Sequence, residues 1–142
     1  MIQPQWSDDG KSIYALVEDD RNQHLVLFDA TSGRMRLLND GRRETTAFDV
    51  GPKGRAVILD AAPDAVDEVY ALERGKERPL SKQNDAWLAG VERGTLEEIT
   101  VTSRDGTRIN GFILKPPGYR PGVRYPTLLQ IHGGPSRSMR TH

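Results

Sequence analysis

Four consecutive residues near the carboxyl end of the sequence are the best suited to chemistry: His132, Gly133, Gly134 and Pro135. Residues 127–131 come before them as a short apolar run with a β-branched residue at each end. This run predicts a strand buried on both faces of a mostly parallel sheet. The two glycines allow a sharp turn, and the proline stiffens its exit. Such a turn exposes backbone N–H groups, which in an acyl-transfer enzyme hold the oxyanion of a tetrahedral intermediate.

The residues around this turn form a longer pattern. Residues 103–119 read SRDGTRINGFILKPPGY, and residues 125–136 read YPTLLQIHGGPS. A DG turn, a strand, a PPG loop, a strand that begins with YP and an HGGP turn follow in that order. With this pattern the chain resembles the prolyl oligopeptidase family of serine peptidases, most closely its acylaminoacyl-peptidase and dipeptidyl-aminopeptidase branch. The related HGGG turn of α/β-hydrolases supplies an oxyanion donor from the loop after the third strand.

The resemblance implies roles for three residues. The backbone N–H of Gly134 is implied to be an oxyanion donor, and His132 and Gly133 are implied to shape the turn. The general base of this fold follows the nucleophile in the chain order Ser, Asp, His. His132 is therefore expected to be a strand-end residue hydrogen-bonded to a neighbouring loop. Full-length family members hydrolyse short peptides or remove acylated or free N-terminal residues, so a peptide is the expected substrate.

The sequence lacks the nucleophile of such an enzyme. A nucleophile elbow reads Gly-x-Ser-x-Gly. The nearest match, residues 134–138, reads GPSRS, overlaps the oxyanion turn and has no Asp after it. Loss of any member of a Ser-His-Asp triad leaves only a residual rate enhancement. We therefore expect this chain to be inactive alone and to be a fragment of a longer serine-type peptidase.

The first half of the chain predicts a repeated β-structure. Two turn segments, WSDDG at residues 6–10 and VGPKG at residues 50–54, each precede a strand. The offset between the copies is roughly 44 residues, within the ~40–45 residues of four-stranded propeller blades. The first copy resembles the TolB-like blades of the propeller in the same peptidase branch. The expected strands cover residues 12–17, 24–29 and 35–38 in the first copy, and 55–60 and 68–73 in the second.

These patterns predict a mainly β chain with two domains. Residues 1–92 are expected to be about two blades at the end of a TolB-like β-propeller. Residues 93–142 are expected to be the first strands of an α/β-hydrolase domain, which begins with a hairpin whose turn is Asp105-Gly106. Residues 81–95 are interpreted as the linker. Repeat architectures need three or more units to cover their faces, so two blades again indicate a piece of a longer protein.

Composition argues against several classes of protein. Lys plus Arg equals Asp plus Glu at 20 each, which argues against a nucleic-acid-binding surface. The chain has no cysteine, and His24, His132 and His142 are too far apart to form a ligand motif, so no metal or cofactor is expected. No transmembrane run and no secretory signal are present in the sequence. A membrane partner is not expected, and cytoplasm is the default location.

Two other interpretations remain open. The chain could be a non-enzymatic β-propeller-like binding module in which HGGP is only a loop. Such a module should be monodisperse and cooperatively folded, whereas a fragment should aggregate or be partly unfolded. A small esterase that keeps only the hydrolase start is the other alternative, but it has no need of a blade repeat. The acidic pairs Asp8-Asp9, Asp19-Asp20 and Glu97-Glu98 are expected to be solvated or to cap turns.

Overall fold

The computed structural model describes residues 3–19, 21–62 and 65–131. They fall into two compact units that divide between Asp85 and Ala86. The described part of the chain is mainly β, and its helical elements are one 3-10 turn and one four-residue α-helix. The mainly β prediction is confirmed. The expected domain boundary between residues 92 and 93 stays a prediction.

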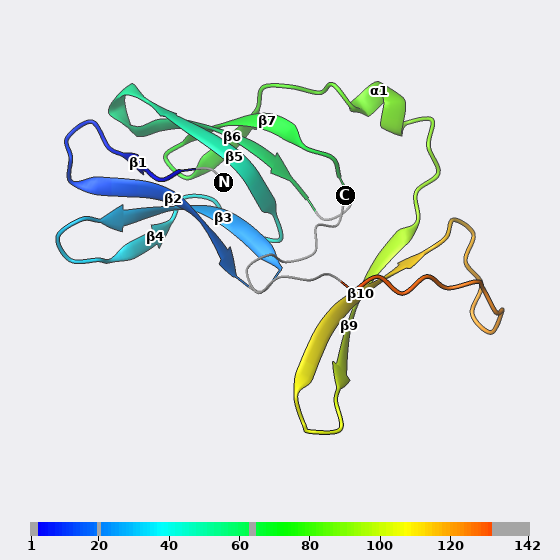
Figure 1. Cartoon of the computed structure of the whole chain (residues 1–142). Coiled ribbons are helices and arrows are strands. Elements are labelled where there is room, and N and C mark those ends of the chain that lie inside the picture. The colour runs from blue at the N-terminus through cyan, green and yellow to red at the C-terminus, as the bar shows by residue number, and fades with distance from the viewer. Residues whose placement is uncertain (1–2, 20, 63–64, 132–142) are drawn as a thin grey trace. The chain divides into compact units, whose positions relative to one another are not determined.

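Two four-stranded antiparallel meanders make up the first unit (Figure 1). The first meander contains β1 (Gln5–Trp6), β2 (Ser12–Asp19), β3 (Asn22–Asp29) and β4 (Met35–Leu37). The second contains β5 (Glu44–Gly51), β6 (Arg55–Ala61), β7 (Glu68–Glu73) and β8 (Lys76–Pro79), with the 3-10 turn η1 (Pro52–Gly54) between β5 and β6. Each strand expected in this half is present, and the sequence analysis missed β1, β5 and β8.

A backbone contact and a shared core join the two meanders. Strands β3 and β5 pair in parallel at Gln23 and Glu44. The buried core cluster takes two residues from the first meander and four from the second: Tyr14, Leu25, Phe48, Ala56, Ile58 and Leu72. Alternate residues of a strand point to one face of its sheet, so each meander contributes one face to this core. Full burial of a side chain such as Leu25 or Ile58 contributes about 1.5–3 kcal/mol.

Turn chemistry explains two of the reversals in this unit. Arg74 and Gly75 connect β7 to β8 with φ values of 53° and 75°, as a two-residue type I′ turn requires. Asp29 ends β3 and accepts hydrogen bonds from the backbone N–H groups of Thr31 and Ser32 at 3.1 and 2.7 Å. Bonds from Ser32 lower the pKa of the Asp29 carboxyl. These bonds hold the turn that follows β3.

The second unit is built on a hairpin. It begins within α1 (Asp85–Leu88) and continues to β9 (Thr95–Thr102) and β10 (Arg108–Lys115). The two strands pair in register from Thr102 with Arg108 to Thr95 with Lys115. Gly106 in the connecting turn has a φ of 88°, and Asp105 caps the turn by accepting from Thr107 N–H at 3.0 Å. The predicted hairpin is confirmed.

The strand predicted at residues 127–131 is not formed in the structure. Residues 123–131 have no regular secondary structure. Leu128, Leu129 and Ile131 are 92%, 79% and 81% exposed. A parallel strand needs hydrogen-bonded neighbours that reach it through crossover connections, and among the described residues no strand pairs with this segment. The expectation of a strand buried on both faces is therefore wrong for this structure. In the same described ranges, no helix is long and apolar enough to span a bilayer.

Candidate functional site

The predicted oxyanion turn lies outside the described residues. His132, Gly133 and Gly134, with Pro135 after them, follow the last described residue, Ile131. Their roles stay predictions. The structure does describe the hairpin and the loop that lead to them.

Aromatic and charged side chains organise the loop after β10. The Tyr119 and Tyr125 rings lie 5.3 Å apart between centroids, and Arg120 N–H donates to the Tyr125 hydroxyl oxygen at 3.0 Å. Lys115 lies 5.0 Å from the centre of the Tyr119 ring and forms an ion pair with Glu97 on β9. Its bond with Glu97 raises the pKa of Lys115. The chain is therefore held beside the end of the hairpin just before Pro126.

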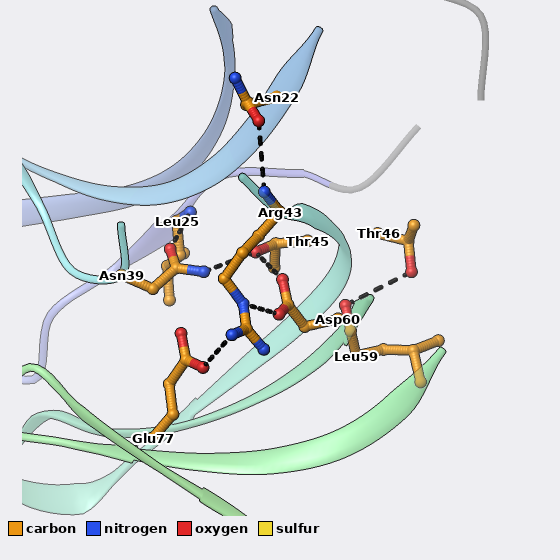
Figure 2. A network of polar contacts seen from close by, with 9 residues as sticks. All are labelled: Asn22, Leu25, Asn39, Arg43, Thr45, Thr46, Leu59, Asp60 and Glu77. Carbon is orange, nitrogen blue, oxygen red and sulfur yellow. Dashed lines mark hydrogen bonds and ion pairs between the residues drawn. The ribbon is translucent and has the colours of Figure 1, made fainter. Parts of the chain in front are cut away.

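A second polar cluster lies inside the first unit and was not predicted from the sequence. Figure 2 shows it as a network of hydrogen bonds and ion pairs that includes residues of β3, β5, β6 and β8. Leu25 N–H donates to Asn39 Oδ1 at 2.9 Å, and Asn39 Nδ2 donates to Thr45 Oγ1 at 2.8 Å. The Thr45 hydroxyl donates to Asp60 Oδ1 at 2.7 Å, and Arg43 Nε donates to Asp60 Oδ2. Each bond polarises the next, which strengthens such networks in a low-dielectric interior.

Arg43 forms an ion pair with Asp60 and so balances the charge of this buried carboxylate. Its Nη1 also lies 2.9 Å from Glu77 Oε2 on β8, and its guanidinium lies 5.2 Å from the Tyr70 ring centre. Burial lowers the pKa of Arg43, but the bond to Asp60 and the attraction of that carboxylate outweigh it, so the pKa is raised. Burial raises the pKa of Glu77, and attraction by Arg43 opposes this shift only in part.

The cluster has the geometry of a structural connection between the meanders. Both carboxylate oxygens of Asp60 are already used by protein donors, and its side chain is fully buried. Asn39 and Arg43 lie on the segment that connects β4 to β5, and Arg43 N–H donates to Asn22 Oδ1 at 3.2 Å. The cluster therefore fixes the crossover from one meander to the next. A signal for it existed in the sequence, because strict alternation in β6 places Asp60 on the same face as Ala56 and Ile58.

The remaining candidates among the described residues include His24 and Asp9. His24 is buried, and its Nδ1 has no hydrogen-bond partner among the described residues. No group of three or more His, Asp or Glu side chains arranged to hold a metal occurs in the part of the chain that the structure describes. Asp9 of the first acidic pair accepts from Ser7 Oγ at 2.7 Å and from Lys11 N–H at 3.1 Å. It therefore caps its turn, as expected.

The fold is similar to part of solved peptidase structures. The structure superposes on an acylaminoacyl peptidase in complex with Z-Gly-Gly-Phe-chloromethyl ketone with a TM-score of 0.71 and 20% identity, over 87% of this chain and 19% of that one. For a Pyrococcus horikoshii acylaminoacyl peptidase the TM-score is 0.62 and the identity 21%, over 75% and 16% of the two chains.

Curated relatives belong to the same class. The chain is 25% identical over 134 residues to the uncharacterized peptidase YuxL of Bacillus subtilis, which is 93% of this chain and 20% of YuxL. It is 23% identical over 140 residues to dipeptidyl-peptidase 5 of Porphyromonas gingivalis, which is 95% of this chain and 20% of that protein. No protein-family model matches. The chain spans about a fifth of these relatives and corresponds to a partial region of peptidases of the prolyl oligopeptidase family.

Proposed function

We propose that the chain is the junction between a β-propeller and the peptidase domain of a serine-type enzyme of the prolyl oligopeptidase family. Residues 1–92 are its last two blades, and residues 93–142 are the start of its α/β-hydrolase domain. One observation carries the proposal: the similarity to YuxL and to dipeptidyl-peptidase 5 runs over 93% and 95% of the chain. Coverage this complete includes residues of both compact units.

The two meanders support the propeller half of the proposal. Propeller blades are four-stranded antiparallel sheets that pack face to face around an axis. Each meander has four strands in chain order, and the core cluster takes residues from both meanders. The outer faces of two such units need further units to cover them. In the parent enzyme the blades would restrict access of peptides to the active site.

The second unit supports the hydrolase half. A hairpin is followed by a proline-rich loop, an apolar segment and the HGGP sequence, in the order typical of the family. In this proposal residues 127–131 become a strand once neighbouring strands are present. Gly134 then supplies a backbone N–H to the oxyanion, while His132 and Gly133 shape the turn. Removal of one such donor from a serine peptidase lowers kcat by about 10²–10³.

The proposed substrates are short peptides or acylated or free N-terminal residues. The sequence contains no Gly-x-Ser-x-Gly elbow, so we expect the chain alone to be inactive. Incubation with a fluorogenic aminoacyl amide and with a fluorophosphonate probe tests this. Turnover above that of a boiled control, or labelling of a serine in this chain, would contradict it.

The positive test uses the continuous reading frame. Genomic sequence beyond the codon for His142 should encode Gly-x-Ser-x-Gly roughly a hundred residues further on, in the Ser, Asp, His order of this fold. The continuous protein should hydrolyse the amide. In it, Gly134→Pro removes the proposed N–H donor and should lower kcat by about 10²–10³ with a smaller change in KM. Gly134→Ala keeps the donor and is the matched control. An equal loss of kcat in both variants would contradict the proposed role of Gly134 as an oxyanion donor.

A further inference from the structure

A short strap of residues at the end of the second meander is tied back onto β7. Leu80 N–H and Ser81 N–H both donate to Val69 O, at 2.7 and 3.3 Å. The Val69 N–H donates in return to Ser81 Oγ at 2.8 Å. Residues 80 and 81 therefore extend the pairing of β7 beyond the end of β8 at Pro79.

The Glu68 carboxylate is the centre of this attachment. Its Oε1 accepts from the backbone N–H and from Nδ2 of Asn84, both at 2.9 Å, and its Oε2 accepts from the Ser81 hydroxyl. Asn84 Nδ2 also donates to Asp67 O at 3.2 Å. Hydrogen bonds from Ser81 and from Asn84 lower the pKa of Glu68. A charged acceptor thus holds both ends of the strap, and bonds to a charged acceptor are the stronger class of hydrogen bond.

The chain changes character directly after Asn84. The boundary between the compact units follows Asp85, and α1 has no buried residue. Trp87 and Val91 are 64% and 40% exposed. Two backbone bonds of this segment are local: Gly90 N–H donates to Trp87 O, and Val91 N–H donates to Leu88 O. Segments with few buried contacts and local bonds open at low free-energy cost.

We propose that Glu68, Ser81 and Asn84 form a latch that fixes the point where the linker leaves the second meander. Residues 80–84 then move with the meander, and bending is confined to residues 85–94. The functional consequence of the latch rests on the proposed function. In a two-domain peptidase, the latch would set the length of the linker that allows the propeller and the peptidase domain to move. The latch itself concerns only residues of the first unit, so it can be tested without peptidase activity.

Limited trypsin digestion of the complete 142-residue chain tests the latch. Lys82 lies within the strap and Arg93 lies in the proposed hinge, and both are exposed. Because cleavage depends on local opening of the backbone, the two sites compare backbone stability at similar side-chain access. Cleavage after Lys82 should be at least about tenfold slower than cleavage after Arg93, as followed by mass spectrometry of the peptides.

Variants assign the protection to the proposed residues. Glu68→Ala and Asn84→Ala should bring cleavage after Lys82 to within about threefold of cleavage after Arg93. Glu18→Ala removes an exposed carboxylate from β2, far in sequence from both cleavage sites, and is the matched control, which should leave the ratio unchanged. Amide exchange in β5 and β6 establishes that each variant is folded. Ser81→Ala is a second, milder variant, in which the Val69 amide should exchange faster because its acceptor is gone.

The wild-type ratio decides the proposal even if a variant fails to fold. Equal cleavage after Lys82 and Arg93 in the wild-type chain would overturn it. So would unchanged protection of Lys82 in folded Glu68→Ala and Asn84→Ala. The two proposals can fail separately. If Lys82 is protected as expected but the continuous protein has no peptidase activity, the latch stands and only the proposed peptidase function is refuted.

Discussion

Thr45 and Asp60 face each other across β5 and β6, and the Thr45 hydroxyl donates to Asp60 Oδ1 at 2.7 Å although both residues are fully buried. The same hydroxyl accepts from Asn39, whose Oδ1 is bound by the amide of Leu25 on β3. The Thr45 side chain is therefore part of a chain of hydrogen bonds that joins the two meanders.

Replacement of Asp60 by Asn should destabilise the first unit strongly. The change removes the charge that balances Arg43 and replaces one of the two acceptor oxygens by an amide donor, so that Arg43 and Thr45 cannot both keep their bonds. Breaking a buried ion pair from one side typically costs about 3–5 kcal/mol. Urea denaturation monitored by tryptophan fluorescence and circular dichroism measures the loss. Asp49→Asn, at an exposed position on β5, is the control and should change stability little.

Thr45 tests this chain of hydrogen bonds with side chains of similar size. Thr45→Val keeps the shape but leaves Asn39 Nδ2 and Asp60 Oδ1 each without one partner, at an expected cost of about 1–3 kcal/mol. Thr45→Ser keeps the hydroxyl and should retain more of the stability. If Ser proved the more harmful substitution, packing of the methyl group rather than the hydrogen bonds would dominate at this position.

Gly94 is expected to tolerate no side chain. A Cβ at this position would lie 2.3 Å from the carbonyl oxygen of Lys115, at the end of the hairpin where Thr95 pairs with Lys115. Gly94→Ala should separate this end of β9 and β10, at a cost of about 1–3 kcal/mol. Faster amide exchange at residues 95 and 115 is the measurement. Gly111→Ala is the matched control, since its Cβ would make only an ordinary contact with Ile99 at 3.5 Å.

The Glu68 latch should weaken in acid. Hydrogen bonds from Ser81 and Asn84 lower the pKa of Glu68 in the folded chain below its value in the unfolded chain. Stabilisation by the latch is thus complete above the unfolded pKa and is lost as the pH falls through the folded pKa. NMR titration of the Glu68 side-chain carboxyl measures this midpoint. In Ser81→Ala the midpoint should move upward, and an unchanged midpoint would contradict the assigned cause.

The exposed apolar segment should make the chain self-associate. Leu128, Leu129 and Ile131 offer unpaired backbone and apolar side chains, a combination that promotes edge-to-edge pairing. Light scattering after size-exclusion chromatography should find associated species. Leu129→Lys should lower their fraction by about tenfold at equal concentration. Val123→Lys, in the preceding loop, is the control. A monodisperse wild-type chain would instead favour the binding-module alternative.

Local sequence signals predicted the hairpins well, because they depend on residues close together in the chain. Asp105-Gly106 between two alternating runs was sufficient for β9 and β10. The strand predicted at residues 68–73 is present in the structure with the same bounds. Strand β8 was missed because Lys76–Pro79 carries no apolar residue apart from its proline, and its pairing is decided by the type I′ turn at Arg74-Gly75.

The features that depend on distant partners could not be predicted in the same way. Residues 127–131 have the composition of a buried strand, but a strand forms only when another strand pairs with it. Asp60 reads as a solvated charge by type, although its burial is decided by Arg43, which lies 17 residues away. The roles expected for Gly134, His132 and Gly133 fall outside the described residues and stay predictions.

The crossover between β4 and β5 has a consequence for how such a protein can change its length. Each meander is completed by a continuous run of sequence, and the next run starts after a short segment held by Asn39 and Arg43. Duplication or deletion of the sequence of one whole meander therefore leaves every hairpin intact. It requires only that the new crossover be held by side chains equivalent to Asn39 and Arg43. Genetic gain or loss of such modules is then limited by a few polar side chains rather than by rethreading of the fold.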